Sequence, residues 1–303
     1  MSSGTQIGWC DRTWNPTTGC TRKSSGCLHC YAETMTARLA AMGRPEYAGL
    51  LDEHGRFNGT LRTLDGRLTE PLHWRKPSRV FVNSMSDLFH PSIPFEFVDK
   101  VFAVMALCPQ HEFQILTKRP ERMAEWSDAV DRLGRITVAM NELCDSTCVH
   151  CCQTEPWPLP NVHLGTSIED QATADGRIPH LLGCPAKVRF LSVEPLIDAV
   201  YIYDAVSCPH CERGDQSSVP LPCKCGHLAD WVIVGCESGP QRRPCRWEWM
   251  ASVVRQCKAA GVPVFVKQLA CNADGTGKVY KHHPGDPWPV WVPEVLRVQE
   301  FPG

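Results

Sequence analysis

The sequence predicts an α/β protein whose parallel strands form a barrel or partial barrel of the (β/α)6 type. Short apolar runs recur along the chain, each run ends in a cluster of polar residues, and helical segments lie between the runs. Near-continuous apolar runs are typical of strands that are covered on both faces. Repeated strand–helix units predict a parallel sheet with right-handed crossovers.

Six runs are expected to be strands, at residues 79–83, 112–116, 161–165, 187–191, 230–235 and 262–266. The polar residues that follow them would gather at the carboxyl ends of the strands, which is where such folds carry their chemistry. Some of these residues are expected to be N-caps of the following helices instead.

Two of the intervening segments show helical spacing of apolar residues. One face is formed by Phe97, Val101, Val104, Met105 and Cys108, and another by Trp247, Met250, Val254 and Cys257. Apolar residues at intervals of three and four predict amphipathic helices that pack on the sheet.

Three segments interrupt the pattern within what we expect to be a single domain over residues 1–303. Residues 44–78 are rich in Gly and Arg and are expected to form a long loop or small subdomain. Residues 141–160 and 207–228 are rich in cysteine and resemble insertions between a helix and the next strand.

Composition indicates an ordinary globular protein that acts in the cytoplasm. The net charge is −2, no apolar run is long enough for a membrane span, and no signal peptide is recognisable at the N-terminus. In a reducing compartment the 18 cysteines indicate metal binding before disulfides. Single cysteines such as Cys108, Cys184 and Cys257 are expected to be small core residues.

The first cysteine cluster combines Cys20, Cys27 and Cys30 on a turn-rich loop that leads into a helix beginning at Tyr31. A helix N-terminus favours thiolate. Because a [4Fe–4S] cluster normally takes four thiolates, three leave one iron open to a cofactor such as S-adenosylmethionine. The alternative is a zinc site completed by His29 or Cys10.

The stretch WNPTTGCTRKSSGCLHCYAE closely resembles the opening motif of a phage-associated family of three-cysteine-motif proteins. VFVNSMSDLFH, FQILTKRPERM, LGTSIEDQATADGRIP, RFLSVEPL and WVIVGCESGP are similar to its later blocks. This family is placed in the radical S-adenosylmethionine superfamily and is similar to spore photoproduct lyase. The Cys-x6-Cys-x2-Cys spacing departs from the superfamily's usual Cys-x3-Cys-x2-Cys, and the usual Gly-Gly-Glu is absent.

The resemblance implies that strand ends hold S-adenosylmethionine. By position, the amino group would meet Asn83, Ser84, Ser86 and Asp87. Contacts to the ribose and carboxylate are expected from Lys118, Ser167, Glu169, Ser192 and Glu194, with Glu237, Ser238 and Gly239 on the far side. Leu28 or Tyr31 would pack on the adenine.

The remaining cysteines predict zinc binding. Cys208, Cys211, Cys223 and Cys225 form two knuckles, with His227 as a possible replacement ligand. A second possible zinc set comprises Cys144, Cys148, Cys151 and Cys152, in which His150 could replace one cysteine. The spacing of Cys144, Cys148 and Cys151 matches the usual radical motif, but it lies inside an insertion, and a spacing match without its structural context is weak. An auxiliary iron–sulfur cluster is the alternative for either set.

We therefore expect a radical enzyme that forms a 5′-deoxyadenosyl radical and acts on a nucleotide or a nucleic-acid base, with an electron donor such as flavodoxin or ferredoxin. Basic residues near the strand ends could steer a phosphate-bearing substrate. These residues are Lys118, Arg119, Arg122, Arg242, Arg243 and Lys267. The alternative is a non-catalytic protein whose zinc or iron–sulfur clusters scaffold a nucleic-acid-binding surface.

Overall fold

The strands are hydrogen-bonded in the order β1-β4-β5-β6-β7-β8-β9-β10, and β2 and β3 form a separate pair. The computed structural model describes residue 5 and residues 7–143, 156–207 and 228–303. The predicted mixed α/β class is confirmed. The chain divides into a first unit, Met1–Leu164 with Cys184–Lys187, and a second unit, Gly165–Gly183 with Val188–Gly303.

The first unit contains three neighbouring parallel strands. β4 (Arg79–Val82) lies between β1 (Arg12–Trp14) and β5 (Glu112–Thr117). β4 and β5 match the predicted runs, and their central residues are buried because both faces are covered. β1 was not predicted, since its three residues, RTW, include a single apolar side chain. β6 (Val162–Ile168) begins in this unit, as predicted.

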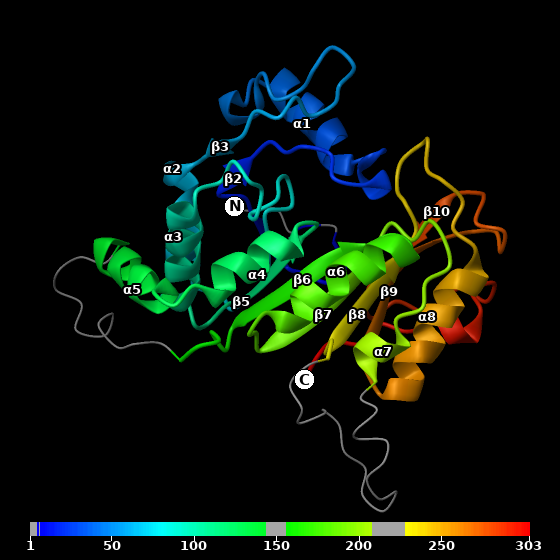
Figure 1. Ribbon diagram of the computed structural model, residues 1–303. Coiled ribbons are helices and arrows are strands. Elements are labelled where there is room, and N and C mark those ends of the chain that lie inside the picture. Colours follow the sequence, from blue (N-terminus) through cyan, green and yellow to red (C-terminus); the bar gives the residue numbers. More distant parts are fainter. Residues whose placement is uncertain (1–4, 6, 144–155, 208–227) are drawn as a thin grey trace, which may run out of the picture. The chain divides into compact units, whose positions relative to one another are not determined.

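Three helices of the first unit follow β4 and β5. They are α3 (Phe95–Ala106), α4 (Pro120–Asp128) and α5 (Arg132–Leu143), and α3 packs against α5 (Figure 1). Pro120 stands in the first turn of α4, where its missing N–H costs nothing and its φ suits a helix. The predicted apolar face of α3 is buried.

Residues 44–78 contain only short elements. These are η2 (Pro45–Tyr47), β3 (Arg62–Thr63), α2 (Asp65–Leu68) and η3 (Glu70–His73). β3 pairs antiparallel with β2 (Thr17–Thr18). Tyr47 and Leu50 are buried against Ala32 and Met85, so part of this predicted loop subdomain contributes to a small core.

The second unit continues the strand–helix alternation. β7 (Val188–Val193), β8 (Trp231–Gly235) and β9 (Val264–Ala270) are parallel, and β10 (Val279–Lys281) is antiparallel to β9. The helices are α6 (Gln171–Gly183), α7 (Tyr203–Val206) and α8 (Trp247–Ala260), followed late in the chain by the short η4 (Glu294–Leu296). α8 packs on β8 and β9 through its predicted apolar face (Figure 1).

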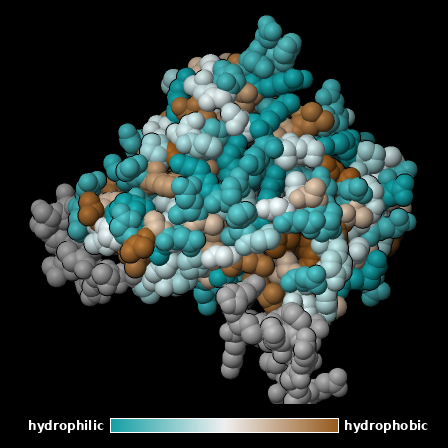
Figure 2. Space-filling model, in the orientation of Figure 1, coloured by the Kyte–Doolittle hydropathy of each residue, from teal (hydrophilic) through white to brown (hydrophobic). Residues whose placement is uncertain are grey.

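Hydrophilic residues dominate the face of the molecule shown in Figure 2, and the apolar residues on it form small, separate groups. Within the described ranges, no helix has the length and apolar character needed to cross a membrane. Cys108, Cys184 and Cys257 are buried, which confirms them as core residues.

Candidate functional site

The cysteine loop occupies the part of the first unit that follows β1 and β2. Cys20 is separated from β2 by Gly19, Cys27 ends the short helix η1 (Ser25–Cys27), and Cys30 immediately precedes α1 (Tyr31–Ala41). Cys27 is buried, and Cys20 and Cys30 are partly buried. Since the charges of Cys27 and Cys30 both raise the pKa of Cys20, the three thiols lie within electrostatic reach of one another.

Cys30 is the N-cap residue of α1, as predicted from the sequence. Burial raises the pKa of its thiol, and the backbone N–H groups of Ala32 and Glu33 oppose that rise. These N–H groups belong to the first turn of the helix, where the N–H of Glu33 also donates to the Cys30 carbonyl at 3.1 Å. The helix N-terminus therefore favours a thiolate that burial alone would disfavour.

Gly19 has a backbone conformation that determines the position of Cys20. Its φ is +87°, which favours glycine, and a Cβ there would lie 2.0 Å from the carbonyl oxygen of Thr60. A side chain at this position therefore meets both backbone strain and a collision with main-chain atoms. The loop before Cys20 can approach residue 60 only because residue 19 is glycine.

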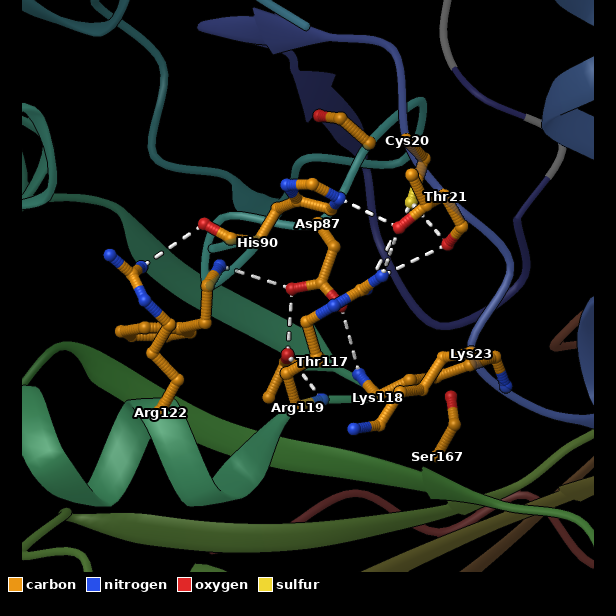
Figure 3. A network of polar contacts seen from close by, with 12 residues as sticks. Cys20, Thr21, Lys23, Asp87, His90, Thr117, Lys118, Arg119, Arg122 and Ser167 are labelled. Carbon is orange, nitrogen blue, oxygen red and sulfur yellow. Dashed lines mark hydrogen bonds and ion pairs between the residues drawn. The ribbon is translucent and has the colours of Figure 1, made fainter. Parts of the chain in front are cut away.

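A buried ion pair lies beside Cys20 (Figure 3). Nη1 of Arg119 donates to Oδ2 of Asp87 at 2.8 Å, and the two side chains are 5% and 8% exposed. The Asp87 carboxylate also accepts hydrogen bonds from the Thr117 hydroxyl at 2.6 Å and from the N–H groups of Lys118 at 3.1 Å and Phe89 at 3.0 Å. The pair thus joins the loop after β4 to the end of β5.

The same arginine holds the backbone next to Cys20. Nη2 of Arg119 donates to the carbonyl and hydroxyl oxygens of Thr21, both at 2.9 Å, while Nη1 lies 4.0 Å from Sγ of Cys20. Burial, followed by the charge of Asp87, raises the pKa of Cys20 to about 12, and the charge of Arg119 opposes this rise. Arg119 is therefore the cation of this group that favours the Cys20 thiolate.

His90 completes the network as a neutral imidazole (Figure 3). Burial, together with the charge of Arg119, lowers its pKa to about 4. The N–H of Ser92 donates to Nδ1 at 3.1 Å, so the ring proton belongs on Nε2, which lies 2.7 Å from the Thr21 hydroxyl. We therefore assign Nε2–H as a donor to Thr21, a second restraint on the residue that follows Cys20.

Two further ion pairs hold the cysteine loop. Arg22 donates through Nε and Nη2 to the buried Glu33 at 3.1 and 2.7 Å, and Nη2 also reaches the carbonyl of Leu28 at 3.2 Å. Lys23 pairs with Glu121 of α4 at 2.7 Å. The first pair closes residues 22–33, which include Cys27 and Cys30, and the second ties the loop to the helix after β5.

The predicted polar residues after β4 are joined to the loop after β1. Nδ2 of Asn83 donates to the Thr17 hydroxyl at 2.7 Å, and that hydroxyl lies 2.7 Å from the Ser86 hydroxyl. Asn83 has a φ of +59°, a conformation that asparagine tolerates better than most residues. Ser84 contacts Asn15 at 3.2 Å, and the Tyr31 hydroxyl donates to the Ser84 carbonyl. Tyr31 itself is 47% exposed.

The second unit carries the predicted cofactor residues from Ser167 onward, and each of the three glutamates among them has a cationic partner within that unit. Glu169 pairs with Arg177 at 3.0 Å, Glu194 with Lys267 at 2.6 Å, and Glu237 with Arg243 at 2.5 Å. Ser167 and Ser192 are buried near the ends of β6 and β7. Burying a carboxylate is costly without such pairing.

Most of the predicted phosphate-steering cations are engaged by protein groups. Arg119, Arg243 and Lys267 form the ion pairs described above. Arg122 donates to the carbonyls of His90 and Ile93, and Arg242 donates to the carbonyls of Gly275 and Gly277. These contacts satisfy donors that the sequence alone suggested for a substrate.

Among the residues that the structure describes, which include Cys20, Cys27 and Cys30, no group of three or more His, Cys, Asp or Glu side chains is arranged to hold a metal ion. Both predicted zinc sets lie outside the described residues, and so do His150 and His227. They are Cys144, Cys148, Cys151 and Cys152, and Cys208, Cys211, Cys223 and Cys225.

Several residues of the network were not predicted. Thr21, His90 and Thr117 each lie close in sequence to a residue that was predicted for the site, and this closeness could have indicated them. The Arg22–Glu33 pair joins residues eleven positions apart across the loop, and no sequence pattern announces it.

Fold and site together define an α/β protein with a largely parallel sheet and a three-thiol loop after its first two strands. The chain belongs to the family described as Protein of unknown function (DUF5131), whose profile matches residues 4–288. Comparisons with curated proteins and with solved structures gave no match.

Proposed function

We propose that the chain is a radical S-adenosylmethionine enzyme whose [4Fe–4S] cluster is bound by Cys20, Cys27 and Cys30. One observation carries the proposal: the loop that follows β1 and β2 bears three thiols in mutual electrostatic reach and leads into a helix N-terminus. The resemblance of WNPTTGCTRKSSGCLHCYAE to the three-cysteine-motif family supports the same assignment.

The donor set fits such a cluster. Burial raises the pKa of Cys20 and Cys30, so thiolates there need compensating positive charge, which iron supplies. A cubane binds each thiolate through a different iron atom, so three cysteines around it do not converge on one point as they would on a single ion. Three ligands leave one iron available to S-adenosylmethionine, whose reductive cleavage to a 5′-deoxyadenosyl radical is the chemistry the cluster supplies.

The cofactor contacts proposed in the first unit are Asn83, Ser84 and Ser86, whose hydroxyl and amide groups form a hydrogen-bonded group with the loop after β1. The cofactor contacts expected from the sequence at Ser167, Glu169, Ser192, Glu194 and Glu237 stay predictions. The eight-stranded sheet would be the partial barrel of the superfamily. The proposed substrate is a nucleotide or a nucleic-acid base, and the proposed electron donor is a flavodoxin or ferredoxin.

The test is anaerobic reconstitution of the full chain with iron and sulfide, followed by addition of dithionite and S-adenosylmethionine. We expect iron and sulfide consistent with a [4Fe–4S] cluster and formation of 5′-deoxyadenosine, both lost in Cys27→Ala. Cys108→Ala is the matched control, because Cys108 is a buried core cysteine of the same unit.

A colourless protein that holds zinc at these thiols and forms no 5′-deoxyadenosine would refute the proposal. That result would favour the second candidate class, a non-catalytic metal-containing nucleic-acid-binding protein. The masses of iron and zinc bound per chain, measured on anaerobically purified protein, separate the two classes without any assumption about substrate.

A further inference from the structure

We propose that Arg119 tunes the cluster by placing a fixed positive charge against its ligand Cys20, and that Asp87 is the residue that positions Arg119. The inference rests on the proposed function and deepens it. It assigns Asp87 the role of positioning Arg119 in place of the cofactor contact expected from the sequence.

The guanidinium of Arg119 is held on several sides. Nη1 bonds Asp87 at 2.8 Å, Nη2 bonds two oxygens of Thr21 at 2.9 Å, and Nη1 also lies 4.0 Å from the Cys20 sulfur. The arginine side chain is 5% exposed. A planar group that is fixed by these contacts has little freedom to turn away from the sulfur.

Asp87 is held in place by donors other than Arg119. Its Oδ1 accepts from the Thr117 hydroxyl at 2.6 Å and the Phe89 N–H at 3.0 Å, and its Oδ2 accepts from the Lys118 N–H at 3.1 Å and from Arg119. Four donors around a carboxylate of 8% exposure leave it little capacity for a further ligand. The geometry therefore points to Asp87 as a positioning residue.

The effect on the cluster follows from charge. One electron from dithionite takes a [4Fe–4S] cluster from its 2+ to its 1+ state and adds one negative charge. A buried cation and an N–H donor beside a ligand sulfur stabilise the reduced state more than the oxidised state, which raises the reduction potential. The charge of Asp87 acts in the opposite direction and has the larger effect on the pKa of Cys20, but of the two side chains it is Arg119 that contacts the sulfur.

The experiment is a redox titration of the reconstituted full chain, followed by electron paramagnetic resonance of the reduced cluster. The variants are Arg119→Gln, Arg119→Lys and Asp87→Asn. Arg135→Gln is the matched control, since Arg135 pairs with the buried Asp99 at 2.8 Å elsewhere in the same unit. Iron content and far-ultraviolet circular dichroism establish that each variant is loaded and folded.

We expect the midpoint potential to shift to more negative values in Arg119→Gln, to shift less in Arg119→Lys, and to stay unchanged in Arg135→Gln. Asp87→Asn removes a negative charge, which by itself shifts the potential to more positive values. A shift to more negative values in Asp87→Asn therefore shows that the guanidinium has left the sulfur, and a shift to more positive values refutes the positioning role. If Arg119→Gln does not retain iron, Arg119→Lys, which keeps the charge but loses the planar fork, carries the comparison. Loaded Arg119 variants with the wild-type potential would overturn the inference and leave the proposed function standing.

Two other results differ from an unchanged potential in the Arg119 variants. If Asp87→Asn keeps the wild-type potential but loses the spectral change on adding S-adenosylmethionine, Asp87 contacts the cofactor and its positioning role is refuted. A wild-type chain that binds no cluster at all overturns the proposed function and, with it, this inference.

Discussion

Replacing Asp87 with asparagine tests how much the buried network contributes to stability in the metal-free protein. Asparagine has nearly the same volume, so the change removes charge without creating a cavity. Its carbonyl can still accept the hydrogen bonds from Thr117 and Phe89, which meet Oδ1. Its amide group would face two donors, the Lys118 N–H and Nη1 of Arg119, which now meet Oδ2.

The expected cost follows from those two lost acceptor contacts. A hydrogen bond to a charged group contributes about 1.5–3 kcal/mol, and removing one partner of a buried ion pair costs about 3–5 kcal/mol because the other charge stays buried. Thr21 offers Arg119 two further acceptors that offset part of this loss, so we expect the free energy of unfolding to fall by about 3 kcal/mol, near the lower end of that range.

The measurement is urea unfolding followed by tryptophan fluorescence, with Glu121→Gln as the control. Lys23 and Glu121 form an ion pair at 2.7 Å, but their side chains are 41% and 42% exposed. An exposed pair of this kind contributes about 0–1 kcal/mol. If Asp87→Asn lowers stability no more than Glu121→Gln does, the reasoning from burial is wrong.

Three further changes test other parts of the structure. Gly19→Ala should destabilise the first unit and lower iron loading, because its Cβ would collide with a backbone oxygen. Burial lowers the pKa of His163 to about 4, so the unfolded chain binds its proton first as the pH falls from about 6.5, and stability should fall by up to about 1.4 kcal/mol per pH unit down to about pH 4. Glu169→Gln should cost about 3–5 kcal/mol, because it leaves Arg177 buried without its anionic partner.

Each of these has its own check. Gly43→Ala shares the positive φ but has no atom within 4 Å of the added Cβ, so equal losses in the two glycine variants would contradict a collision at Gly19. Urea unfolding between pH 4 and 7 should give a shallower pH dependence for His163→Gln, and an unchanged slope would count against the neutral buried imidazole. For Glu169→Gln, a loss under about 1 kcal/mol would show that the pair behaves as an exposed one.

The six apolar strands were predictable because both of their faces are covered, which leaves a continuous apolar run such as 231–235 in the sequence. The strand β1 was not predictable from the sequence, because its position beside β4 depends on the backbone pairing of Arg12, Thr13 and Trp14 and not on its own composition. β10 has the same explanation, since it gains its partners by antiparallel pairing with β9.

By itself the sequence determined the alternating α/β pattern, the helix that begins at Tyr31 and the position of Cys30 at its start, because each depends on neighbours within a few residues. Only the tertiary structure decided which charges meet. Arg119 lies ninety-nine positions from Cys20 and thirty-two from Asp87, yet it contacts both. Such contacts depend on which strand ends the sheet brings together, and a carboxylate that could bind a cofactor looks the same in a sequence as one that holds a buried arginine.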